Sequence, residues 1–152
     1  MVAVGKSVPD LRSDSTSGPI RLRDLRGQPV VVYFYPKDNT SGCTREAQDF
    51  RDLARAFAKH KAILLGVSRD SLASHEKFRA KQKLTFALVS DPDETWCRAF
   101  DVIREKTLYG RKFMGVVRST FLISADGKLL REWRGVKVPG HAQAVLEAIS
   151  AT

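Results

Sequence analysis

The chain has 152 residues, of which 43% are hydrophobic, a size that suits one domain with a sizeable core. The first residues contain no apolar stretch behind a basic end, and no run of about 18 apolar residues occurs anywhere, so we expect a soluble, cytoplasmic protein. The formal net charge is +9, but the basic residues are dispersed, which argues against nucleic-acid binding as a main role. The two cysteines are too few for a disulfide scaffold and lack the spacing of a metal site.

Residues 1–28 are polar and rich in turn-forming residues, and a turn at Ser17 and Gly18 predicts a small hairpin there. The apolar run Val30–Tyr35 predicts a buried strand, and a polar loop leads from it into a charged amphipathic helix that begins at Cys43. The helical pattern is a recurrence of apolar residues every three or four positions: Ala47, Phe50, Ala54 and Phe57.

The segment Ala62–Ser68 is short and apolar, which predicts a second buried strand, parallel to the first because a helix joins them. Asp70 or Ser71 then provides the N-cap of a helix that runs to about Gln82. Residues 86–89 predict a third short strand.

Asp91 as N-cap, Pro92 in the first position and Glu94 three residues beyond the cap predict the start of another helix, which ends near Phe100. Asp91, Asp93 and Glu94 form an acidic cluster, which we interpret as a helix start rather than as a cation site.

Residues 104–115 are basic and show little periodicity, so we expect a mobile surface loop there. Residues 116–123 and 128–135 predict two strands of a hairpin around Asp126 and Gly127, and residues 141–150 predict a final helix. The predicted fold class is therefore α/β: a thioredoxin-like fold, in which helices flank a central mixed β-sheet that carries an N-terminal β-hairpin addition. The expected domain is single and spans residues 1–152.

Cys43 stands where the loop becomes the helix, and the free N–H groups of a helix's first turn favour an anion such as a thiolate. A disulfide oxidoreductase would carry a second cysteine three residues further on, but position 46 is Glu46. The sequence therefore predicts a lone nucleophilic thiolate.

Pro36, Thr40 and Cys43 reproduce the PxxxTxxC signature of the peroxiredoxins. The chain is similar over nearly its whole length to the bacterioferritin-comigratory or peroxiredoxin Q branch, through YFYPKDNTSGCTREAQDFRD, GVSRDSLASHEKF, LVSDPDE and RSTFLISADGKL. The resemblance implies an antioxidant thiol-dependent peroxidase that reduces hydrogen peroxide and organic hydroperoxides through a Cys43 sulfenic acid. It also implies a monomer or weak dimer. From composition and residue spacing we expect no cofactor, no metal and no membrane or nucleic-acid partner.

Five residues are candidate catalytic residues, and the resemblance supports in particular the roles of Pro36 and Arg118. Cys43 attacks the peroxide, Thr40 offers its hydroxyl to sulfur or peroxide, and Pro36 shields the sulfur. Arg118 pairs with the thiolate and the peroxide oxygens. From the residues alone, Thr40 could equally be a plain N-cap, Pro36 a strand terminator and Arg118 an exposed edge residue. Glu46 either orients Arg118 or simply stabilises the helix start.

Many members of this branch reduce the sulfenic acid with a second cysteine, but here the two expected positions hold Gln48 and Arg79. Cys97 lies among apolar neighbours, which indicates a core thiol rather than a resolving cysteine. The hypothesis is a one-cysteine cycle completed by an external thiol reductant, such as thioredoxin or a glutathione/glutaredoxin system. Ser41, where the branch often has proline, loosens the loop.

The missing resolving cysteine keeps open a second interpretation, a peroxide sensor or redox-regulated binding protein that uses the same cysteine. The three histidines, His60, His75 and His141, have charged or small neighbours and no mutual ligand spacing, so we expect them at the surface.

Overall fold

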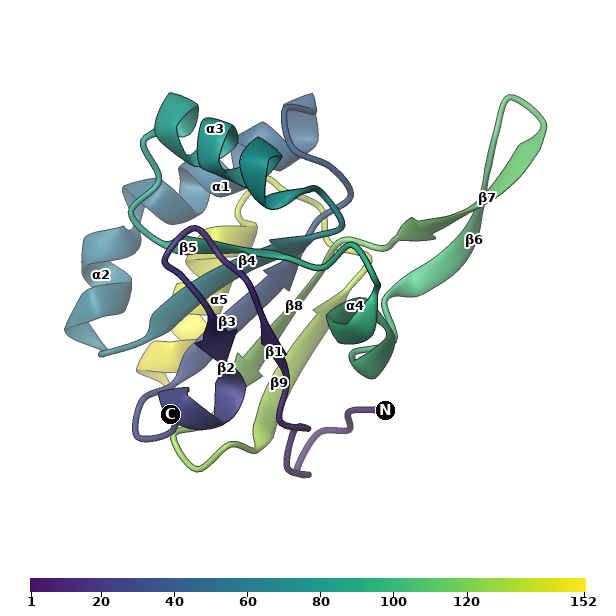
Figure 1. The fold of residues 1–152 in the computed structure, drawn as a ribbon. Helices are drawn as coiled ribbons and strands as arrows, with labels where there is room; N and C mark the ends of the chain where they lie inside the picture. The colour runs from purple at the N-terminus through teal and green to yellow at the C-terminus, as the bar shows by residue number, and fades with distance from the viewer.

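The computed structural model describes all of residues 1–152 and contains a five-stranded sheet in the order β5-β4-β3-β8-β9 (Figure 1). Its strands are β3 (Val30–Phe34), β4 (Ile63–Ser68), β5 (Ala87–Ser90), β8 (Ser119–Ile123) and β9 (Leu129–Arg134). β3 and β5 pair parallel with β4, whereas β8 pairs antiparallel with both β3 and β9. The predicted mixed sheet is confirmed.

Helices and the N-terminal segment cover the two faces of this sheet. One face carries the four longer helices, which are α1 (Ser41–Asp52), α2 (Ala54–Lys59), α3 (Leu72–Gln82) and α5 (His141–Ser150). The other face carries α4 (Thr95–Ala99) and the segment with β1 (Arg12–Ser13), β2 (Ile20–Arg21) and the 3-10 helix η1 (Leu22–Leu25). None of these helices combines the length and the apolar composition that a membrane crossing requires.

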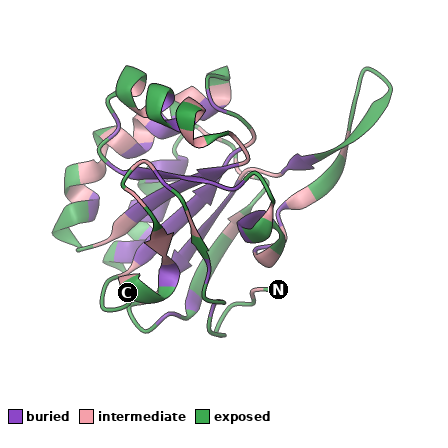
Figure 2. Ribbon diagram, in the orientation of Figure 1, coloured by how far each residue is buried: buried purple, intermediate pink, exposed green.

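The central strand β3 is buried along its whole length, as Figure 2 shows. Val31 and Tyr33 point into the core beneath α1, α2, α3 and α5, whereas Val30, Val32 and Phe34 point into the core on the opposite face. Successive side chains of a strand point to opposite faces, so a strand covered on both faces reads as a continuous apolar run.

The N-terminal hairpin forms as predicted. β1 and β2 pair antiparallel, and Gly18 in the turn has a φ of 88°, a conformation that glycine adopts without a steric penalty. An isolated bridge joins Ser15 to Val89, so the hairpin segment lies against the edge strand β5. This contact covers part of an edge that would otherwise expose unpaired backbone groups.

The helix predicted to begin at Cys43 begins two residues earlier and is interrupted. Thr40 has extended backbone angles, and its carbonyl accepts the first helical hydrogen bond from the Thr44 N–H at 2.9 Å. Cys43 is therefore the third residue of α1. At Leu53 the backbone leaves helical geometry, with φ −101° and ψ 6°, which separates α1 from α2.

The prediction of a mobile loop over residues 104–115 is wrong, because the segment forms an antiparallel hairpin of β6 (Ile103–Leu108) and β7 (Arg111–Val116). Tyr109 and Gly110 at its tip both have positive φ, the geometry of a two-residue hairpin turn. Most of its side chains are exposed, so no apolar alternation marks it in the sequence. The predicted strand 116–123 is consequently split between β7 and β8.

The helix predicted directly after Asp91 begins later, at Thr95, because Glu94 adopts a left-handed conformation with φ 64°. Asp91 nevertheless serves that helix. Its carboxylate accepts the backbone N–H groups of Trp96 at 3.0 Å and Cys97 at 2.8 Å. The interpretation of the acidic residues as a helix start therefore holds, with a different cap geometry.

Candidate active site

Cys43 lies in the first turn of α1, which follows the carboxyl end of β3 and a short loop. Its thiol takes part in no disulfide, and the residue is 1% exposed, so its surroundings are more enclosed than the polar flanking residues of the sequence indicate. The helix N-terminus adds partial positive charge on one side of the sulfur.

Arg118 supplies full positive charge on another side. Its Nη2 lies 3.4 Å from the sulfur of Cys43, and its Nη1 donates to Oε1 of Glu46 at 2.7 Å. Arg118 directly precedes β8, where Ser119 pairs with Phe34 at the end of β3, and this register brings the arginine beside the loop. The guanidinium therefore bridges a thiol and a carboxylate from the same helix.

Gly42 makes this approach possible. A Cβ atom at Gly42 would lie 3.1 Å from Nη2 of Arg118, which is closer than most such contacts. A glycine immediately before Cys43 thus leaves room for the guanidinium over the first turn.

Glu46 is 1% exposed, and burial raises the pKa of its carboxyl to about 7 against the opposing attraction of Arg118. Its second oxygen, Oε2, is buried without a hydrogen-bond partner. Burial alone disfavours the charged form of Arg118, but Glu46 and Cys43 outweigh it and raise the pKa of the guanidinium. Arg118 therefore remains a cation, whereas the carboxyl of Glu46 gains a proton and loses its charge as the pH falls through about 7.

Thr40 and Pro36 flank the cysteine at the surface. Thr40 is exposed, and its hydroxyl donates to the carbonyl of Lys37 at 2.8 Å, so it neither caps the helix with its side chain nor contacts the sulfur here. Pro36 is half-buried and lies just beyond the end of β3. The structure thus brings Cys43, Arg118 and Glu46 into contact and leaves Thr40 beside them.

Lys106 is a further cation of this region that the sequence did not indicate. Its ammonium donates to the carbonyl of Val116 at 2.6 Å, and burial, together with the charges of Arg118 and Arg69, lowers its pKa. Lys106 lies on β6, so its place in this region could be predicted only from a sequence signal for the hairpin.

Two of the three histidines are buried, so the surface prediction is wrong for them. His75 is completely buried in α3, and His141 is 7% exposed at the start of α5. Burial, assisted by the charge of Arg118, lowers the pKa of His141 to about 4, so its ring is neutral at pH 7. His60 is exposed as predicted. Short-range sequence neighbours miss such burial because it depends on which side of a helix faces the sheet.

Cys97 is fully buried, which confirms the predicted core thiol. It belongs, with Val30, Val32 and Phe34, to the hydrophobic cluster on the face of the sheet opposite to Cys43. Burial raises the pKa of the Cys97 thiol well above its usual range, and the neighbouring carboxylate of Asp91 adds to this effect.

Comparisons with known proteins show which family the chain belongs to. Residues 4–131 match the profile of the AhpC/TSA family. Peroxiredoxin Bcp of Xanthomonas campestris is 56% identical over 130 residues, which cover 86% of this chain and 81% of the relative. Peroxiredoxin Bcp of Bacillus subtilis is 44% identical over 149 residues, which cover 97% and 95% of the two chains.

Solved structures lead to the same group. The bacterioferritin comigratory protein of Xanthomonas campestris superposes with a TM-score of 0.92 at 49% identity, covering 98% of each chain. BcpB of Mycobacterium tuberculosis has a TM-score of 0.87 at 35% identity, covering 99% of this chain and 98% of the other.

A thioredoxin-like sheet that presents a cysteine at a helix start beside an arginine defines a class of thiol-dependent enzymes, and this chain belongs to the AhpC/TSA family. Within the family it groups with the Bcp and peroxiredoxin Q proteins, and it is a thiol peroxidase.

Proposed function

We propose that Cys43 is the peroxidatic residue and reduces hydrogen peroxide and organic hydroperoxides. The observation that carries the proposal is the guanidinium of Arg118, which lies 3.4 Å from the sulfur and is held by Glu46. The solved Xanthomonas campestris relative is described as having alkyl peroxide reduction activity, which supports the extension to organic hydroperoxides.

In the proposed first step, the thiolate of Cys43 attacks the terminal oxygen of the peroxide. An S–O bond forms as the O–O bond breaks, and the electron pair departs on the other oxygen, which takes a proton from solvent and leaves as water or an alcohol. The sulfur is oxidised by two electrons to sulfenic acid. Arg118 stabilises both the thiolate and the charge that develops on the leaving oxygen.

Thr40 and Pro36 shape the approach to the sulfur in this proposal. The hydroxyl of Thr40 rotates from the carbonyl of Lys37 to the peroxide, which places the two oxygens in line with the sulfur. Pro36 has no N–H and a fixed φ, so it provides a rigid apolar wall beside the thiol.

The proposed cycle uses one cysteine of the chain. Cys97 lies on the other face of the sheet, so a disulfide with Cys43 would require the core to open. At the fifth residue after Cys43, Gln48 donates to the side chain of Gln82 at 3.0 Å and joins α1 to α3. These contacts support reduction by a thiol from outside.

In the second step, an external thiolate attacks the sulfenic sulfur of Cys43, an S–S bond forms, and hydroxide leaves with a proton as water. A second external thiol then breaks the mixed disulfide and restores the thiol of Cys43. The proposed reductants are thioredoxin or a glutathione/glutaredoxin system, which fit a cytoplasmic location. The proposal also treats residues 1–152 as one domain that acts as a monomer or weak dimer, with no cofactor and no membrane or nucleic-acid partner.

Hydroperoxide consumption with a thiol reductant tests the proposal in Cys43→Ser, with Cys97→Ser as the matched control. We expect activity to disappear in Cys43→Ser and to persist in Cys97→Ser. Peptide mapping after one equivalent of peroxide should show oxidation at Cys43 without a Cys43–Cys97 disulfide. Retained activity in Cys43→Ser would reject the role of Cys43, and the disulfide would reject the one-cysteine cycle.

A further inference from the structure

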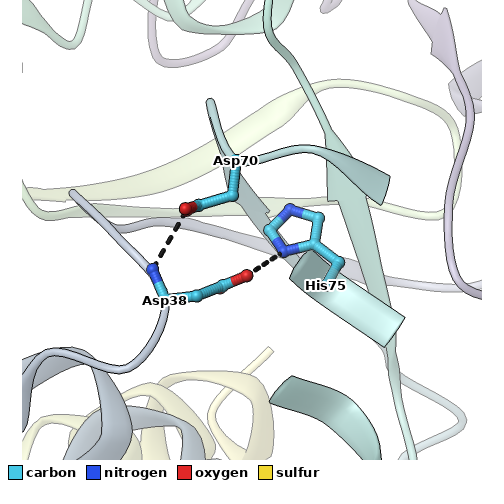
Figure 3. A group of neighbouring side chains, drawn as sticks. All are labelled: Asp38, Asp70 and His75. Atoms are coloured by element: carbon cyan, nitrogen blue, oxygen red, sulfur yellow. Dashed lines mark hydrogen bonds and ion pairs between the residues drawn. The ribbon is translucent and has the colours of Figure 1, made fainter. Parts of the chain in front are cut away.

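A buried polar network lies beside the loop that leads to Cys43. Figure 3 shows its three central side chains, which are Asp38 from that loop, Asp70 from the turn after β4 and His75 from α3. The side chains of Asp38 and His75 are 1% and 0% exposed, respectively. These three residues lie within the segments that resemble the peroxiredoxins, but none of them is among the five candidate catalytic residues.

Asp38 accepts every hydrogen bond that its carboxylate makes. Its Oδ1 accepts from the hydroxyl of Tyr35 at 2.6 Å, and its Oδ2 accepts from the hydroxyl of Ser74 at 2.9 Å. Oδ2 also lies 2.8 Å from Nδ1 of His75. Two hydroxyl groups and an imidazole nitrogen can each donate to this side chain, an arrangement that suits a carboxylate.

His75 has an acceptor at each ring nitrogen. Nδ1 faces the carboxylate of Asp38, and Nε2 lies 3.0 Å from the carbonyl oxygen of Val89, which has no hydrogen to donate. A ring that donates from both nitrogens satisfies both acceptors, and this doubly protonated form belongs to the inference stated below. In that form, Asp38 and His75 make a fully buried ion pair whose remaining hydrogen-bonding positions are also satisfied.

The ligand atoms of Asp38, Asp70 and His75 lie within 4.8 Å of one another, a spacing that would also suit a metal ion. The hydrogen bonds favour the ion pair, because both nitrogens of His75 and both oxygens of Asp38 already have protein partners. Asp70 is likewise engaged, since its Oδ2 accepts the backbone N–H of Asp38 at 3.0 Å.

The loop depends on Asp38 for its attachment. Between Pro36 and Thr40, every hydrogen bond to another segment of the sequence, other than those made within the start of α1, passes through the side chain or N–H of Asp38. Asn39 has a φ of 65°, an uncommon conformation for a residue other than glycine, so the loop requires support from its surroundings.

We propose that the Asp38–His75 ion pair is the positioning element that fixes this loop against α3 and β5 and so presents Cys43 to Arg118 and to peroxide. His75 is a positioning residue, because it acts on the reaction through Asp38 and the loop. The inference rests on the proposed role of Cys43 as the peroxidatic residue.

Single-turnover oxidation of Cys43 by hydrogen peroxide tests this inference in His75→Gln and Asp38→Asn. Each change keeps a polar side chain of similar size and removes one charge of the pair. We expect the second-order rate constant to fall about 10²-fold in both variants, since a displacement of about 1 Å at a reacting group has an effect of that size. The matched control is His60→Gln, the same change at an exposed histidine, which should keep the wild-type rate.

Two further measurements separate positioning from a purely structural role. Reduction of the Cys43 sulfenic acid by a small dithiol should change much less than its formation, because that step does not require the aligned peroxide. In the wild-type chain, the ring nitrogens of His75 should show the NMR shifts of a doubly protonated imidazolium. A folded His75→Gln or Asp38→Asn variant that oxidises at the wild-type rate overturns the proposal, as does a singly protonated His75. If Cys43→Ser kept its activity, the proposed function would fail instead, so the two failures are distinguishable.

Discussion

The two cysteines of this chain occupy comparable positions with opposite electrostatic surroundings. Each is the third residue of a helix, Cys43 in α1 and Cys97 in α4, and each is at most 1% exposed. Arg118 contacts the sulfur of Cys43, whereas the carboxylate of Asp91 lies beside Cys97 and raises its pKa further. Burial and helix position are therefore shared, whereas the neighbouring charge differs in sign, with a cation at the sulfur of Cys43 and a carboxylate beside Cys97.

The largest effect on this contrast should come from weakening the cationic contact at Cys43. Arg118→Lys keeps the charge but loses the planar fork that reaches both the sulfur and Glu46. We expect the rate constant for Cys43 oxidation to fall about 10²- to 10³-fold, as when one donor to a developing oxyanion is removed. Stopped-flow measurement with hydrogen peroxide checks this, and Arg131→Lys on the exposed part of β9 is the control. A rate within the error of the wild type would contradict it.

Glu46 tests whether a buried carboxyl on the same helix costs stability when it ionises. Its pKa is raised from 4.5 to about 7 in the folded chain, so the folded state holds the proton more tightly than the unfolded state. The protonated form of Glu46 therefore favours the folded state more than the ionised form does. This stabilisation is fully present below about pH 4.5 and is lost as the pH rises through 7. Glu46→Gln cannot ionise, so its free energy of unfolding relative to wild type should rise by up to about 3 kcal/mol between pH 4 and pH 8.

Urea unfolding at a series of pH values measures this difference. Glu76→Gln, the same change at an exposed position of α3, is the control and should give a curve parallel to that of the wild type. A Glu46→Gln curve that is also parallel to the wild type would show that Glu46 ionises alike in both states.

A change at Asp91 tests whether the carboxylate beside Cys97 contributes to the low reactivity expected of that thiol. Asp91→Asn replaces one of the two oxygens that accept the N–H groups of Trp96 and Cys97, so we expect a loss of about 1 to 2 kcal/mol in unfolding free energy. The removal of the negative charge should also raise the alkylation rate of Cys97 in the folded chain. Chemical denaturation and mass spectrometry measure the two effects, with Asp93→Asn as the exposed control. An unchanged Cys97 alkylation rate would remove the charge of Asp91 from the explanation.

Gly42→Ala should have the smallest effect. It tests how closely Arg118 must approach the first turn of α1. The new methyl group would lie 3.1 Å from Nη2 of Arg118, and the flexible guanidinium can yield by a few tenths of an ångström. We expect Cys43 oxidation to slow by roughly two- to fivefold, since small displacements of a reacting group have graded effects. The same stopped-flow assay checks this, and a loss as large as that of Arg118→Lys would indicate damage to the helix start instead.

Much of the fold could be predicted from the sequence because its signals are local. The continuous apolar run of β3 and the turn at Asp126 and Gly127 each depend on residues close together in the chain. The limits predicted for the last helix, α5, agree with the structure. The hairpin of β6 and β7 was missed because its side chains are largely exposed on both faces, so the alternation that reveals a strand is absent.

The candidate site was predictable only in part, for the same reason. A helix-start cysteine and its neighbours within PxxxTxxC are readable in order, and a resemblance pointed to Arg118, which is 75 residues away from Cys43. Nothing local indicates that His75 meets Asp38, 37 residues earlier, because this contact depends on how α3 packs against the sheet.

Patterns along the chain were enough to establish the layered α/β architecture, the lone cysteine at a helix start and the absence of a cysteine at position 46 or 48. Which charges stand beside each thiol depends instead on the packing of the folded chain. Pairing of β8 with β3 brings Arg118 to Cys43, and the sheet itself places Cys97 on the opposite face. Electrostatic interactions act through space over a few ångströms, so their partners follow from strand register and helix packing rather than from distance along the chain.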